Sequence, residues 1–356
     1  MTDMTESEGS PAAPENRGKT WTSRLFRLVT WLVALGCFYL VYTKIEGAAA
    51  REGTTALGYL GNFFAEADWT LWLALMIPYS CFFFLVDAHA TWRVIKWYNA
   101  PPIKYTNVLP IRASAYVLSL VNEQVSKGAI SLYLLRKYQV PVWQAISTMI
   151  LMGMVEIYQL LVFSAIGAFF YWDTVLLADA QSELPLVQIL LSVYAGAFLY
   201  FPLHVLYFRG YLLKGSTLRE KPLLRAFRLA KVTDYFLVLL FKAPNLLAAV
   251  GVYTGALALF NVDVGFGVML ALLPLIFLAA ALPLPFHAGA LVLWTVLFPN
   301  FPEVGAFSLV MHTFFVIFNA VIGVVFLPKA NKELFVDDRL DINAMSDEAA
   351  QSPDRA

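Results

Sequence analysis

The sequence consists of long apolar segments, most of them near 20 residues, separated by shorter polar loops. The hydrocarbon core of a bilayer is about 30 Å thick, and a helix needs about 20 mostly apolar residues to cross it. Of the 356 residues, 60% are hydrophobic and 14% are charged, whereas soluble domains are roughly half apolar and a quarter charged. The sequence therefore predicts an all-α, polytopic integral membrane helix bundle.

Seven segments are predicted to cross the membrane fully, and tryptophan or tyrosine lies near many of their ends, as in an interfacial aromatic belt. The first segment is expected to be a retained helix and not a signal peptide, because Lys44 and Glu46 precede the small residues after it. Residues 1–20 and 330–356 are predicted to be disordered polar tails around a membrane domain at 21–329. The seven segments are about 25–42, 69–88, 142–171, 185–208, 235–260, 265–282 and 305–327.

Two further segments are apolar but interrupted. Residues 113–135 contain the polar run from Asn122 to Gly128, and residues 283–298 open with two prolines and a glycine. Non-helical backbone at membrane depth persists only where protein or water surrounds it. We therefore expect two broken or re-entrant helices inside the bundle. Paired broken helices occur in transporters built from repeats, where they lie at the binding site, although no residue-level repeat is visible here.

The distribution of lysine and arginine predicts the orientation, since these residues are enriched in cytoplasmic loops. Loop 209–231 has seven bases and one acid, whereas 172–184 has three acids and no base. A basic region is also expected at 93–112, so the N-terminus should be cytoplasmic and 113–135 should enter and leave from that side. The C-terminal tail is cytoplasmic if 286–298 crosses fully, and lies outside if that segment is re-entrant.

The polar run in the first broken segment is a candidate binding site. Asn122 and Ser126 are four residues apart, as are Glu123 and Lys127, and Gly128 follows. On a helix each pair would share a face, and burying such groups in hydrocarbon is costly unless they are paired. One interpretation is a polar pocket for a lipid headgroup or an ion. The alternative is a loop at the water interface.

Three polar residues interrupt other apolar segments. Glu156 and Gln159 lie midway along 142–171, and an intramembrane carboxyl group is a functional candidate. Glu156 could bind a cationic headgroup, pair with a base or carry a proton, or it could join two helices. Lys242 could contact a lipid phosphate or Glu156, or extend its stem to the interface.

The C-terminal half offers a second group of candidates: His287 and Gly289 in the second broken segment, and His312 and Asn319 on nearly one face of the last helix. Such groups more often join helices than bind ligands. The four histidines have no metal-ligand spacing, and no nucleotide-binding motif is present, so no metal or other cofactor is predicted. Asp87 and His89 are expected to be solvated at the end of their segment.

The predicted partners are membrane lipids, with anionic headgroups at the basic loop 209–231. The formal net charge of zero argues against a nucleic-acid partner. The sequence identifies no protein partner.

Two stretches resemble the lysylphosphatidylglycerol synthase transmembrane, or flippase-like, membrane proteins of bacteria. In the first, Asn122 and Gly128 are followed by Leu134-Leu135-Arg136-Lys137 and by Val140-Pro141. The second, 282–323, is similar to the family's proline-glycine broken helix and last span. The chain departs from the family at Ser126, Lys127 and Ala129, where the family has proline and an acid.

The resemblance implies lipid handling in a bacterial cytoplasmic membrane. The leading hypothesis is a lipid translocase or lipid-binding transporter with a polar intramembrane cavity. Two alternatives remain: an intramembrane transferase acting on a lipid substrate, in which Glu123 or Glu156 would be the acid or base, and a membrane scaffold subunit that transports nothing.

Overall fold

A computed structural model describes residues 17–121, 123–181, 185–282, 284, 287–298 and 300–335, and all its regular elements are helices. Six helices contain a stretch long and apolar enough to cross a membrane, which confirms an integral membrane helix bundle. These six helices are α1 (Arg17–Arg51), α3 (Trp69–Tyr98), α6 (Val142–Phe170), α8 (Leu186–Phe208), α10 (Val232–Ala258) and α13 (Val304–Phe335).

The shorter helices form two hairpins and the connections at the ends of the bundle. The first hairpin pairs α4 (Tyr105–Val121) with α5 (Glu123–Tyr138), and the second pairs α11 (Phe266–Ala280) with α12 (Ala288–Leu297). The connections contain α2 (Ala56–Ala65), α7 (Trp172–Gln181), the 3₁₀ helix η1 (Pro222–Leu224) and α9 (Arg225–Leu229).

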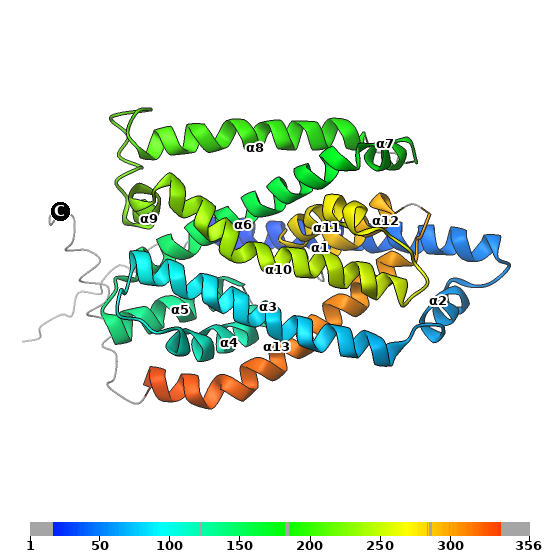
Figure 1. The fold of residues 1–356 in the computed structure, drawn as a ribbon, viewed down its shortest axis with the longest axis horizontal. Coiled ribbons are helices and arrows are strands. Elements are labelled where there is room, and N and C mark those ends of the chain that lie inside the picture. Colours follow the sequence, from blue (N-terminus) through cyan, green and yellow to red (C-terminus); the bar gives the residue numbers. More distant parts are fainter. Residues whose placement is uncertain are drawn as a thin grey trace, which may run out of the picture.

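The prediction that 265–282 is a seventh full span is wrong. Helix α11 has 15 residues, so it is about 22 Å long at the standard rise and falls short of a bilayer core of about 30 Å. It instead packs against α12. The second re-entrant element is therefore longer than the predicted 283–298, and the end of α13 lies at the same end of the bundle as the start of α1 (Figure 1).

The order of elements repeats once along the chain. Two long helices, a hairpin and a third long helix occur first as α1, α3, α4–α5 and α6, and then as α8, α10, α11–α12 and α13. The two hairpins start from opposite ends of the bundle (Figure 1), as in inverted repeats. Each hairpin packs against the last long helix of the other half, α4 on α13 and α11 on α6.

Glycine allows both of these crossings. A Cβ atom at Gly167 of α6 would overlap the backbone of Ala271 in α11, and one at Gly323 of α13 would overlap Val117 in α4. Since only glycine lacks this atom, the two helix pairs can approach backbone to backbone. The hairpins are therefore fixed inside the bundle at equivalent places in the two halves.

The two ends of the bundle differ in charge. The connections 99–104, 139–141 and 209–231 lie at one end, and the connections 52–68 and 171–181 lie at the other (Figure 1). The first end, called here the basic end, carries the loop with seven bases and one acid. The second, called the acidic end, carries Glu52, Glu66, Asp68 and Asp173. The predicted basic region 93–112 is mostly helical, because α3 continues to Tyr98 and α4 begins at Tyr105.

Candidate functional site

Four charged side chains and one tyrosine form a connected cluster inside the bundle, called here the charge cluster. They come from four elements: Asp87 from α3, Arg112 and Tyr116 from α4, Glu156 from α6 and Lys242 from α10. The first hairpin contributes two of them. Helix α3 packs against α4, α6 and α10, so the central helix of the first half holds the cluster together.

Asp87 is the hub of the charge cluster. Its Oδ2 atom accepts hydrogen bonds from Arg112 Nε at 2.6 Å and from the Tyr116 hydroxyl at 2.7 Å. Its other oxygen, Oδ1, lies 3.3 Å from Lys242 Nζ. The side chain of Asp87 is only 4% exposed, so two cations share one buried carboxylate.

Lys242 joins this hub to Glu156. Its Nζ atom donates to Glu156 Oε1 at 2.8 Å, and its side chain is 4% exposed, whereas the side chain of Glu156 is 47% exposed. The charges alternate in the order Glu156, Lys242, Asp87, Arg112 and sum to zero when all four are ionised.

The charge cluster lies deep in the bundle. Glu156 is the middle residue of the 29-residue helix α6. Asp87 is about 16 Å from the end of α3 at Tyr98, and Lys242 is about 15 Å from the start of α10 at Val232, at the standard helical rise. These helices are long enough to cross the membrane, so the cluster is at the depth of the hydrocarbon.

Buried polar atoms continue from the cluster toward the acidic end. Among the described residues, Gln159 Nε2, Asn245 Oδ1 and Ser80 Oγ are buried without a hydrogen-bond partner. Gln159 and Asn245 each lie one helical turn beyond Glu156 and Lys242, and Ser80 lies about two turns from Asp87 on the same side. Asn245 uses its Nδ2 atom to bind the Phe83 carbonyl oxygen at 3.2 Å. An unsatisfied buried polar group costs about 1–3 kcal/mol, so these atoms are suited to meet water or a polar ligand.

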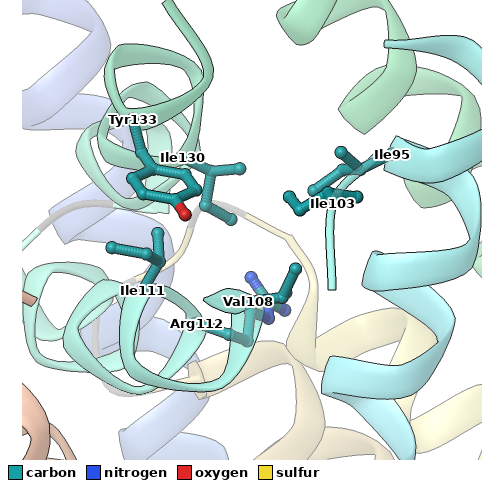
Figure 2. A pocket seen from close by; sticks show the side chains of 7 residues that line it. All are labelled: Ile95, Ile103, Val108, Ile111, Arg112, Ile130 and Tyr133. Carbon is teal, nitrogen blue, oxygen red and sulfur yellow. The ribbon is translucent and has the colours of Figure 1, made fainter. Parts of the chain in front are cut away.

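A small cavity lies between the charge cluster and the basic end. Its volume is about 10 Å³, which is room for about one water molecule. Arg112 and Tyr133 extend toward it while isoleucines and a valine form its walls (Figure 2). Arg112 therefore contacts Asp87 through Nε and lines this cavity with the same side chain. The other lining residues are Ile95, Ile103, Val108, Ile111 and Ile130.

The predicted candidates do not all lie in the charge cluster. Glu156 and Lys242 form an ion pair, which was one of the alternatives given for Lys242. The other alternative, extension of the Lys242 stem to the membrane interface, is ruled out because Lys242 is buried. Gln159 is buried one turn from Glu156. Gly128 of α5 is exposed. Asn122 and the side chains of Glu123, Ser126 and Lys127 lie outside the part of the chain that the structure describes.

The candidates of the C-terminal half form a separate contact. The rings of His287 and His312 lie 4.2 Å apart between centroids, and Asn319 is half-buried on the same helix as His312. A Cβ atom at Gly289 would lie 2.8 Å from the Ala279 carbonyl oxygen, so Gly289 allows α12 to pack closely on α11. These residues belong to the second hairpin and α13, whereas the charge cluster is built by α3, α4, α6 and α10.

The expectation that Asp87 is solvated at the end of its helix is wrong. Helix α3 extends ten residues past the predicted end at Ala88, so Asp87 lies inside the helix and is 3% exposed. Arg112 was expected in the basic region 93–112 outside the helices, but it lies inside α4. Tyr116 was not singled out, whereas Asn245 was noted only as an interruption of the apolar segment 235–260. The run of four bases and no acid over 93–112 was a usable signal, because a buried carboxylate needs a nearby cation.

The fold and the charge cluster together define a polytopic α-helical membrane protein with two opposed hairpins and an intramembrane ionic site. Comparisons of the chain with protein-family models, with curated proteins and with solved structures found no match.

Proposed function

We propose that the protein is a membrane lipid translocase of the flippase-like kind. The headgroup passes the charge cluster inside the bundle while the acyl chains remain in the bilayer. The basic end and the N-terminus face the cytoplasm, in keeping with the enrichment of lysine and arginine in cytoplasmic loops. The host membrane is the cytoplasmic membrane of a bacterium, as the resemblance of the hairpin sequences implies.

The exposure of Glu156 is the observation that carries this proposal. Its side chain is 47% exposed at the midpoint of α6, while its partner Lys242 is 4% exposed. A charged side chain facing acyl chains at this depth costs about 3 kcal/mol or more. The space beside Glu156 is therefore polar, and a lipid headgroup or water fills it.

The composition of the cluster supports function over stability. Replacing a buried ion pair with apolar residues of similar volume is often neutral or stabilising. Four buried charges therefore add less to the stability of the bundle than apolar side chains of the same size would. Intramembrane charges that pair with one another commonly mark substrate pathways. The buried polar atoms of Gln159, Asn245 and Ser80 extend the polar surface from Glu156 toward the acidic end, which gives the headgroup a direction of travel.

The Glu156→Gln variant tests the proposal in reconstituted vesicles. A fluorescent phospholipid in the inner leaflet is protected from an impermeant quencher, and the loss of this protection measures movement between leaflets. We expect the wild-type protein to accelerate the loss over empty vesicles. Glu156→Gln should slow it at least about tenfold, because a hydrogen bond to a charged group contributes about 1.5–3 kcal/mol.

The matched control is Glu52→Gln, the same substitution at an exposed position of the acidic end, which should keep the wild-type rate. Wild-type protein that moves lipid no faster than empty vesicles would refute translocation. Transport that survives Glu156→Gln would show that the cluster is structural. A changed chemical inventory of lipids in cells that lack the protein, measured by mass spectrometry, would instead favour the transferase alternative.

A further inference from the structure

The connection that follows α8 has a defined shape. Residues 209–221 leave the helix at Gly210, whose φ is +81°, and the Arg219 side chain closes the loop. Its Nη1 and Nη2 atoms donate to the carbonyl oxygens of Tyr207 and Lys214, both at 3.3 Å. The Tyr207 and Ser216 hydroxyls lie 2.8 Å apart. These bonds tie the start of the loop to its end.

The closed loop presents apolar side chains outward. Tyr211 is 70% exposed, Leu213 is 73% exposed and Leu218 is 53% exposed. Leu213 has a φ of +48°, a conformation that is uncommon for a residue other than glycine. A loop surrounded by water would leave this apolar surface hydrated, which is unfavourable. The exposed leucines and tyrosine therefore indicate an apolar surrounding.

Cationic side chains border this apolar surface. Arg209, Lys214 and Lys221 are exposed. The one acid of the loop, Glu220, is bound by Arg219 at 3.3 Å and by Arg228 at 3.7 Å. The side chain of Glu220 is itself 65% exposed, so the outer surface of the loop is apolar with an excess of positive charge. This combination is found in segments that insert into anionic membrane interfaces.

The position of the loop places it beside lipid. It lies at the basic end of α8, which forms an outer edge of the bundle (Figure 1). Only Leu186, Leu190 and His204 of this helix are buried, so its middle faces lipid around most of its circumference. A loop that begins directly after such a helix lies at the level of the lipid headgroups.

We propose that residues 209–221 form a membrane anchor, in which Tyr211, Leu212 and Leu213 insert between lipids and the flanking bases bind anionic headgroups of the bilayer surface. The anchor fixes the basic end of α8, a helix with few buried contacts of its own. This inference does not depend on the translocase proposal.

Site-directed spin labelling tests the anchor in the full-length protein. The native cysteines Cys37 and Cys81 are replaced with alanine, and a label is attached at Leu213→Cys or, as the control, at Thr217→Cys in the same exposed loop. Collisions with oxygen report contact with acyl chains, and collisions with a soluble nickel chelate report contact with water. The vesicles contain phosphatidylcholine alone or mixed with phosphatidylglycerol.

We expect the label at position 213 to show a several-fold higher oxygen-to-nickel ratio than the label at position 217 in the mixed vesicles. Replacing Lys214 and Lys221 with glutamine should shift the insertion equilibrium at least roughly fivefold toward water, given the usual contribution of a base near an anionic surface. Equal ratios at the two positions would overturn the anchor. Insertion that is unchanged by phosphatidylglycerol and by the lysine substitutions would overturn headgroup binding.

Discussion

Replacing Asp87 with asparagine is expected to lower the free energy of unfolding by about 3–5 kcal/mol, the usual cost of breaking a buried ion pair from one side. The asparagine can still accept the Tyr116 hydroxyl, but it no longer compensates the charges of Arg112 and Lys242. Glu156 alone then faces two cations, and one of them stays buried without a counter-charge. Equilibrium unfolding in mixed detergent micelles measures the change.

The same substitution at Asp173 is the matched control. Asp173 is exposed in α7, so Asp173→Asn should change the free energy of unfolding by less than about 0.5 kcal/mol. Adding Arg112→Met to Asp87→Asn restores a net charge of zero and should recover at least about 1 kcal/mol. If Asp87→Asn were as mild as Asp173→Asn, the buried hub would not exist.

The second large effect is expected at Lys242, where methionine should cost about 3 kcal/mol or more. Methionine keeps most of the apolar stem but removes the ammonium group that lies between two carboxylates. Asp87 retains Arg112 as a partner, whereas Glu156 loses the cation at 2.8 Å. A lysine that only extended its stem to the interface would cost far less when replaced.

A double-mutant cycle distinguishes a Lys242 that is paired with Glu156 from one that only extends its stem to the interface. Glu156→Gln combined with Lys242→Met removes one charge of each sign, so the double variant should be more stable than the sum of the two single effects predicts. We expect a coupling energy of about 1–3 kcal/mol, within the range for residues in one ionic network. Additive effects would contradict the ion pair.

The long helices could be predicted from the sequence because hydropathy over about 20 residues is a strong signal in lipid. The exception was residues 265–282, which are apolar enough for a span but form a helix of only 15 residues that packs on α12. Residues buried inside a bundle and residues facing lipid are both apolar, so hydropathy does not distinguish a re-entrant arm from a span. The first hairpin could be predicted because the polar run interrupts its apolar sequence and because the bases on both sides of it place its two ends on the same side of the membrane.

The charge cluster was only half predictable. Glu156 and Lys242 stand out because each interrupts an apolar run, and their contact was one of several alternatives. Asp87 and Arg112 lie in sequence next to polar connections, where burial and solvation give the same local pattern. Only the packing of α4 against α3 turns both side chains inward, and the run of four bases without an acid over 93–112 is the trace that this contact leaves in the sequence.

The most direct test of the proposed polar space beside Glu156 compares the accessibility to water of two neighbouring positions of α6. The side chain of Glu156 is 47% exposed, and the neighbouring Ile157 is also exposed. The two positions differ in depth by about 1.5 Å. In a protein without Cys37 and Cys81, cysteine at either position is treated with a charged, membrane-impermeant thiol reagent, which requires a hydrated thiolate. We predict that the cysteine at 156 reacts and the cysteine at 157 does not. Two unreactive cysteines would place Glu156 against acyl chains and contradict the intramembrane site.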